Sequence, residues 1–284
     1  EKPRLGLIVT VAAGITNMVL DALFIAVFNW GVAGAAIATG LSQCVGGVLP
    51  LIYFLRPNDS LLRMRPTSLR LCPILQACGN GSSELMSNIS SSLVGMLYNF
   101  QLMHLIGEDG VSAYGVLMYV QFIFVAIFIG YSIGCAPVVS FHFGAQNHNE
   151  LKSLLRKSTL LMASGGILLT IAARLLAAPL ARLFVGYDAG LFELTSHAFR
   201  LFSWSFLLAG FNIFASGFFT ALNNGAISAA ISFLRTLVFQ TASVLILPLL
   251  LGVDGIWWAI TVAEMFAFLI SLMFLYLKRN KYHV

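Results

Sequence analysis

Two polar side chains, Asn17 and Asp21, lie one helical turn apart in an otherwise apolar stretch near the start of the sequence. Residues at i and i+4 share one face of a helix, so the two can approach the same ligand. An ionised Asp at the centre of a membrane-spanning helix costs on the order of 2.5 to 3.5 kcal/mol, which makes such a carboxyl a candidate functional group. Several oxygens together suit a sodium ion, and desolvation favours a protonated carboxyl, so either Na⁺ or H⁺ could bind here.

Further polar groups occur at matching depths beyond a short turn near Trp30. Asp21 lies about nine residues before Trp30 and Thr39 about nine after it, which places both ~13 Å from the turn at ~1.5 Å per residue. The same count pairs Asn17 with Gln43. We therefore predict a coupling-ion site at Asp21, Asn17 and Thr39, with a structural hydrogen-bond cluster between the two helices as the alternative.

The composition identifies the chain as an integral membrane protein. Its 284 residues are 59% hydrophobic and only 10% charged, with a mean hydropathy of +0.90, whereas soluble domains carry about 25% charged residues. The net charge of +5 comes from Lys and Arg clustered between apolar runs, which is typical of membrane topology signals and not of a nucleic-acid surface. We find no metal-ligand spacing and no catalytic motif, so an enzyme is not expected.

The predicted fold class is an all-α polytopic membrane bundle, because a backbone in lipid must satisfy its own hydrogen bonds. Eight apolar runs are long enough to cross a bilayer: 5–28, 31–55, 73–104, 111–140, 158–178, 199–222, 225–251 and 254–277. Most of the 16 Lys and Arg residues fall on the side of the N-terminus, so both termini are expected in the cytoplasm. The segment from Pro179 to His197 is predicted to be a longer external segment, with an interfacial helix as one form that it could take.

The sequence contains a repeat that divides the chain. Residues 31–38 resemble residues 252–259 at an offset of 221 residues (252 minus 31), and each copy starts after a tight turn. Six apolar runs fit that offset, which indicates a two-lobed transporter of six plus six helices. Residues 1–56 would be the last two helices of the N-terminal lobe, 57–72 a cytoplasmic linker and 73–284 the six-helix C-terminal lobe. Four upstream helices are therefore expected.

The order of several motifs resembles the multidrug and toxic compound extrusion (MATE) family, bacterial multidrug-efflux branch. The residues that carry the resemblance are the hairpin with Asn17 and Asp21, the F-G-A-Q-N at 143–147, Arg235 in S-F-L-R, and the G-V-D-G-I-W-W at 252–258. The resemblance implies helices five to twelve of a twelve-helix antiporter, driven by protons or sodium, that exports cationic amphiphilic compounds by alternating access. It also assigns Asn17, Asp21 and Thr39 to the coupling-ion site, together with an acid on the first helix.

The same resemblance and the depth of certain residues nominate a substrate cavity. Glu84 and Glu264 lie near mid-membrane and could attract a cationic substrate, or could pair with Arg235 inside the lobe. Glu84 matches an acid of a second sodium site in another branch, but the run 199–222 lacks the acid that such a site needs. The further cavity candidates, for which ordinary packing is the alternative, are Gln43, Met96 and Tyr119.

The remaining expectations concern partners and location. No cofactor is expected besides the coupling H⁺ or Na⁺. The expected partners are small cationic molecules and membrane lipid, without nucleic acid, and the expected state is a monomer in the inner membrane of a bacterium. A lipid-linked saccharide flippase of the same superfamily is the alternative function; it would need more basic residues in its cavity.

Overall fold

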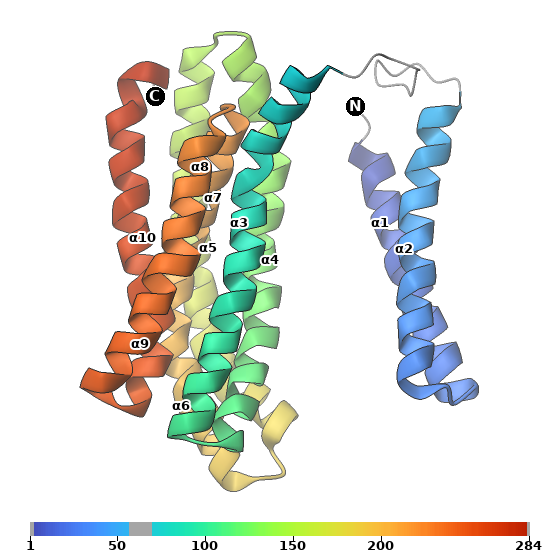
Figure 1. Cartoon of the computed structure of the whole chain (residues 1–284), viewed down its shortest axis with the longest axis vertical. Coiled ribbons are helices and arrows are strands. Elements are labelled where there is room, and N and C mark those ends of the chain that lie inside the picture. The colour runs from blue at the N-terminus through green and yellow to red at the C-terminus, as the bar shows by residue number, and fades with distance from the viewer. Residues whose placement is uncertain (1–2, 57–69, 283–284) are drawn as a thin grey trace. The chain divides into compact units, whose positions relative to one another are not determined.

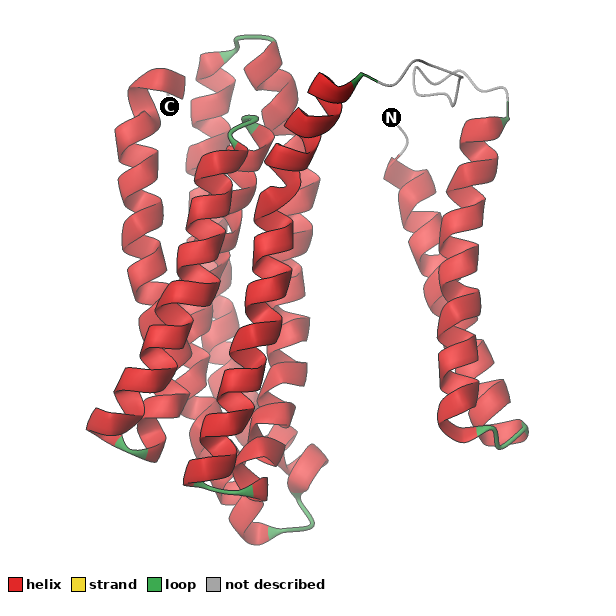
Figure 2. Ribbon diagram, in the orientation of Figure 1, coloured by secondary structure: helices red, strands yellow, loops and turns green. Residues whose placement is uncertain are grey.

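The computed structural model describes residues 3–56 and 70–282, and helices are the only regular secondary structure in these two ranges (Figures 1 and 2). The chain divides into two compact units, Glu1–Arg70 and Leu71–Val284. The predicted linker lies almost wholly in residues 57–69, outside the described residues.

The N-terminal unit is one helical hairpin. Helix α1 (Pro3–Asp21) continues into a π-helical segment, η1 (Ala22–Val27), and α2 (Gly31–Leu55) returns alongside α1. The turn is tight because Asn29 and Gly31 adopt positive φ angles of 55° and 56°, which Gly and Asn tolerate best. The ring of Trp30 stacks on that of Phe24 at 5.0 Å and closes the turn.

The C-terminal unit is a bundle of long helices connected by short turns. Its elements are α3 (Leu71–Leu105), α4 (Glu108–Gly144), α5 (His148–Val185), α6 (Ala189–Phe202), η2 (Ser203–Ser205), α7 (Phe206–Ala221), α8 (Gly225–Phe233), η3 (Leu234–Phe239), α9 (Gln240–Leu251) and α10 (Val253–Tyr282). The side chains of Asn147, Asp188 and Asn224 accept hydrogen bonds from backbone N–H groups at the starts of α5, α6 and α8. Such caps satisfy donors that lack partners within the helix and fix where each helix begins.

Helix α7 forms the centre of this bundle, in contact with α4, α5, α8 and α10. Its aromatic side chains, among them Phe206, Phe214 and Phe218, are fully buried. Neighbouring helices approach closely where a glycine lies: a Cβ on Gly166 would come within 2.7 Å of the Leu207 carbonyl oxygen, and one on Gly225 within 2.5 Å of a backbone atom of α3. Small residues at such crossings are how membrane helices pack without a hydrophobic driving force.

Each of the eight predicted apolar runs is helical in the structure, but the helices differ in how apolar they are. Seven helical segments of the described chain are long and apolar enough to cross a membrane, and α3 is not among them. Polar residues along α3, including Glu84, Asn88 and a run of serines, lower its hydropathy. Its length of 35 residues, ~52 Å at ~1.5 Å per residue, still matches its neighbours in the bundle.

The segment from Pro179 to His197 is helical for most of its length, and its external location stays a prediction. Helix α5 passes through Pro179 and ends at Val185, and α6 already starts at Ala189. A proline inside a helix removes one hydrogen bond and bends it, but packing against neighbouring helices can hold the helix together.

The repeated turn has a structural reason in both copies. Gly31 and Gly252 occupy equivalent positions and both have positive φ, 56° and 61°. Three residues later, a Cβ on Gly34 would lie 3.0 Å from the Cβ of Phe24, and one on Gly255 would lie 2.3 Å from the Leu247 carbonyl oxygen. The two shared glycines therefore have the same structural role in each hairpin. The first, with its positive φ, allows the chain to reverse direction, and the second allows the two helices to pack closely.

Candidate functional site

In the N-terminal unit, Asp21 is the last α-helical residue before the π-helical segment η1. One of its carboxylate oxygens, Oδ1, is buried and has no hydrogen-bond partner among the described residues. A buried acceptor without a partner is costly, and Asp21 shares this feature with several other described side chains, among them Tyr98 and Trp257. Asp21 differs from these two in that its side chain can carry a negative charge at neutral pH. π-Helical segments inside α-helices are also frequent at functional sites.

The predicted partners of Asp21 do not form bonds with it. Asn17 is partly buried one turn earlier on α1, and Thr39 is exposed on α2. Among the described residues no hydrogen bond joins Asn17, Asp21 and Thr39, and the hydroxyl of Ser42 uses the backbone carbonyl of Thr39 instead. The coupling-ion site therefore stays a prediction, in which these side chains would have to converge on the ion.

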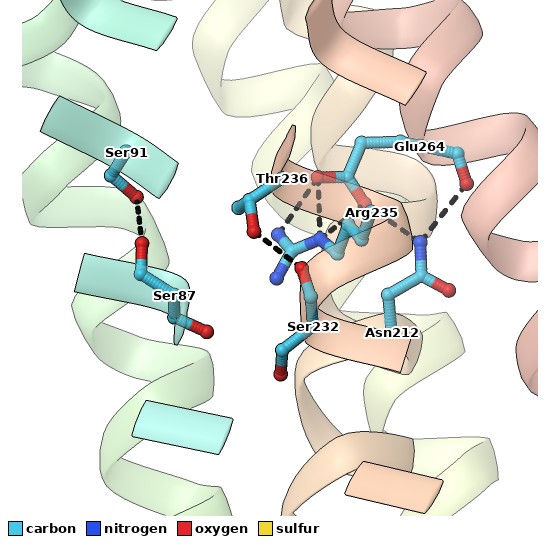
Figure 3. A network of polar contacts seen from close by, with 7 residues as sticks. All are labelled: Ser87, Ser91, Asn212, Ser232, Arg235, Thr236 and Glu264. Carbon is cyan, nitrogen blue, oxygen red and sulfur yellow. Dashed lines mark hydrogen bonds and ion pairs between the residues drawn. The ribbon is translucent and has the colours of Figure 1, made fainter. Parts of the chain in front are cut away.

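The C-terminal unit contains a buried charged cluster of three residues (Figure 3). Glu264 on α10 is 3% exposed, and its Oε1 lies 2.7 Å from Nη2 of Arg235. The Nε of Arg235 donates to both carboxylate oxygens, at 2.9 and 3.1 Å. Asn212, which is fully buried on α7, donates from Nδ2 to Glu264 Oε2 at 2.7 Å and to the Glu264 backbone carbonyl at 2.9 Å. The cluster therefore ties α7, η3 and α10 together.

This geometry assigns Glu264 to the second of its two predicted roles, as the partner of Arg235 inside the lobe. Bidentate guanidinium–carboxylate pairs are the strongest ordinary hydrogen-bonded ion pairs, and a buried charge needs such a partner. Arg235 lies in the π-helical segment η3. The sequence analysis missed Asn212, although it is the one amide in helix α7 and a strongly polar residue in a membrane span is a usable signal.

A cluster of hydroxyl groups lies between α7 and α8. The hydroxyl of Ser216 lies 2.9 Å from that of Ser228 and 2.9 Å from that of Ser232, and the Thr220 hydroxyl lies 2.7 Å from that of Ser228. Ser228 also donates to the Ser216 carbonyl at 2.8 Å. On the next turn of the chain, Thr236 donates to the Ser232 carbonyl. These contacts satisfy hydroxyls within an apolar bundle and bind the two helices to each other.

The other predicted cavity residues lie on the surfaces of their own units. In the C-terminal unit, Glu84 and Met96 on α3 and Tyr119 on α4 are exposed, Met96 by 69% and Tyr119 by 71%. The amide of Asn88 donates to the Glu84 backbone carbonyl at 2.8 Å, not to the Glu84 carboxylate. Among the described residues this carboxylate has no hydrogen-bond or ion-pair partner. Gln43 is exposed on the N-terminal unit. The cavity role of these exposed residues stays a prediction, whereas Glu264 is enclosed.

Comparisons with known proteins agree with this architecture. The multidrug export protein MepA of Staphylococcus aureus (strain bovine RF122 / ET3-1) is 22% identical over 283 residues, and MepA of Staphylococcus saprophyticus is 24% identical over 286 residues. Each alignment covers 98% of this chain and 61% of the relative, so the chain spans about three fifths of the length of these proteins.

Solved structures share the fold. A crystal structure of MATE in complex with MaL6 superposes with a TM-score of 0.90 at 20% identity, over 97% of this chain and 63% of that one. An outward-facing multidrug resistance MATE family transporter of the MOP superfamily gives 0.89 at 22% identity, over 97% and 62%.

A family model provides the assignment. The MatE model matches residues 85–245, which is more than half of the chain and extends from α3 into α9. This match confirms the resemblance that the order of the sequence motifs indicated, and it agrees with the relatives and the solved structures. The protein belongs to the MatE family of multi-pass membrane transporters.

Proposed function

We propose that the protein is an ion-coupled antiporter that exports cationic amphiphilic compounds by alternating access. The observation that carries the proposal is the buried, unpartnered Oδ1 of Asp21 at the boundary between α1 and the π-helical segment η1. A proton on this carboxyl, or a sodium ion shared with Asn17 and Thr39, would remove the cost of the unpaired acceptor. Occupancy could then favour one packing of the hairpin over another and so bias the transport cycle.

The exposed surface of α3 and α4 supports a cationic, amphiphilic substrate. The Glu84 carboxylate supplies negative charge, and the flexible Met96 and the amphipathic Tyr119 supply adaptable apolar contact. The similarity to proteins named as multidrug export proteins points to the same substrate class.

The flippase alternative is less favoured because two basic residues within the spans of the C-terminal unit are already engaged. Arg235 is held by Glu264, and the Arg174 guanidinium lies over the Trp204 ring at 4.6 Å. A phosphate-bearing saccharide would need free cations in a cavity. We propose further that the protein acts as a monomer in a bacterial cell membrane with both termini in the cytoplasm, on the basis of the Lys and Arg distribution.

The test is dye export under an imposed gradient. Cells expressing the full-length protein are loaded with ethidium, and efflux is measured after imposing a proton gradient or a sodium gradient. We expect Asp21→Asn to abolish gradient-dependent efflux, because the amide can neither bind a proton nor neutralise a sodium ion. Glu193→Gln, which makes the same change on the exposed surface of α6, should leave efflux intact. Gradient-dependent efflux by Asp21→Asn would refute the coupling role.

A further inference from the structure

An open hollow lies between α5 and α6, at the end of the C-terminal unit where these two helices meet. Its volume is about 570 Å³, and its lining consists of Ala178, Pro179, Arg182, Leu183 and Phe192. Figure 1 draws this turn in yellow. Four of the five lining residues are apolar, and the fifth carries a permanent positive charge. The volume is within the range of small-molecule sites, so the hollow can hold part of a ligand.

The hollow is at the depth of the lipid headgroups. About 25 residues separate Lys157 from Arg182 on α5, which corresponds to ~37 Å at ~1.5 Å per residue. A bilayer has ~30 Å of hydrocarbon and ~40–45 Å including headgroups. With Lys157 in one headgroup layer, Arg182 therefore lies in the opposite one. The exposed ring of Tyr187, five residues after Arg182, is typical of that layer.

The guanidinium of Arg182 has no partner of its own. Among the described residues no ion pair or side-chain hydrogen bond involves it, and its side chain is exposed. The nearest acid along the chain, Asp188, uses Oδ1 to cap α6 by accepting from the Leu191 N–H. By contrast, Arg174, about two turns closer to the membrane centre, is satisfied by the Trp204 ring. Arg182 thus presents a cation where phosphates are concentrated.

We propose that this hollow binds one anionic phospholipid. The Arg182 guanidinium binds the phosphodiester, for which its planar donors are suited, and the apolar wall of Ala178, Pro179, Leu183 and Phe192 contacts the first carbons of an acyl chain. The lining contains no carboxylate, so the amine of a zwitterionic headgroup finds no partner and an anionic lipid is preferred. Pro179 removes a backbone donor and so supplies a wall without an exposed N–H. This inference rests on the membrane location alone, not on the proposed export activity.

The test is lipid binding to the purified chain in detergent, followed by native mass spectrometry during titration with phosphatidylglycerol or phosphatidylcholine. We expect the first phosphatidylglycerol to bind more tightly than phosphatidylcholine, and Arg182→Gln to weaken it roughly tenfold, as expected for loss of a charge-assisted hydrogen bond. Arg156→Gln removes an equally exposed charge from the other end of α5 and should have little effect.

A second variant tests the apolar part of the hollow while leaving the charge in place. Ala178→Phe fills the hollow and should weaken both lipids alike. Three outcomes would overturn the proposal: Arg182→Gln binding phosphatidylglycerol as the wild type does, Arg156→Gln losing as much affinity as Arg182→Gln, or Ala178→Phe leaving the first lipid unaffected. Because Arg156 and Arg182 are exposed and Ala178 is half-buried beside the open hollow, circular dichroism should show native helix content in every variant.

Discussion

Replacing Glu264 with Gln tests the buried charged cluster most directly. The amide preserves the side-chain volume and still accepts from Asn212, but it removes the charge that neutralises Arg235. The Arg235 side chain is only 18% exposed, so its guanidinium would remain largely desolvated and unpaired. Breaking a buried ion pair by removing one partner costs about 3–5 kcal/mol. Because a minor part of Arg235 reaches the surface, we expect a loss of about 3 kcal/mol.

The assay is thermal unfolding of the purified chain in detergent, with tryptophan fluorescence as the readout. At ~2–4 °C per kcal/mol for a chain of this size, Glu264→Gln should lower Tm by roughly 6–12 °C. The matched control is the double variant Arg235→Met with Glu264→Gln, which removes both charges and should recover most of that loss. The reasoning would be refuted if Glu264→Gln melted within about 1 °C of the wild type, or if the double variant were less stable than Glu264→Gln alone.

Three further changes test the packing of the bundle, each by the same melting assay. Ser228→Ala removes the fully buried hydroxyl at the centre of the α7–α8 cluster. We expect it to lower the free energy of unfolding by about 1–3 kcal/mol, because the partners of this hydroxyl lose a hydrogen bond. An unchanged Tm would contradict this. Gly225→Ala places a Cβ against the backbone of α3 and should destabilise strongly, whereas Gly130→Ala, with nothing within 4 Å, should be neutral or slightly stabilising; equal effects would count against the close approach. His197→Ala breaks the pair with Asp254, whose side chains are 51% and 52% exposed, and should change stability by less than ~1 kcal/mol; a larger loss would show that this pair is structural.

The fold was predictable from the sequence because lipid leaves few alternatives. Long apolar runs have to be helices in a bilayer, so all eight runs are helical in the structure, although their ends moved and α3 is not among the seven segments apolar enough to span a membrane. The helix ends in the structure differ from the predicted ends of the runs where hydropathy does not mark a boundary. The external segment was expected to start at Pro179, yet α5 continues through this residue to Val185, because packing against neighbouring helices can stabilise a helix that contains a proline. Likewise the π-helical segments η1 and η3 could not be predicted, because the periodicity of such short apolar stretches does not distinguish a π-helix from an α-helix.

The candidate site was predictable only in part, because spacing along one helix says which residues share a face but not what lies opposite. The count along the hairpin placed Asp21 and Thr39 at equal depth, but the rotation of each helix leaves Thr39 exposed. For Glu264 the sequence left two roles open, and only tertiary contacts could choose between them. The choice depends in part on Asn212, which donates to Glu264 from a third helix. The local sequence around Glu264 does not indicate that this helix packs against it.

The two copies of the repeated hairpin differ in the charged residues that they carry. Glu264 occupies the position of Gln43 in the repeat, and the position of Arg235 corresponds to Gly14 in the N-terminal unit, while Asp21 corresponds to Ala242. In the second hairpin, Glu264 therefore pairs with Arg235, and this ion pair neutralises the acid within the lobe. In the first hairpin, no described residue supplies such a counter-charge, and the Oδ1 of Asp21 has no partner among the described residues. Since an acid without a counter-charge is free to bind an external cation, this difference supports the proposal that Asp21 binds the coupling ion, whereas Glu264 is held by Arg235.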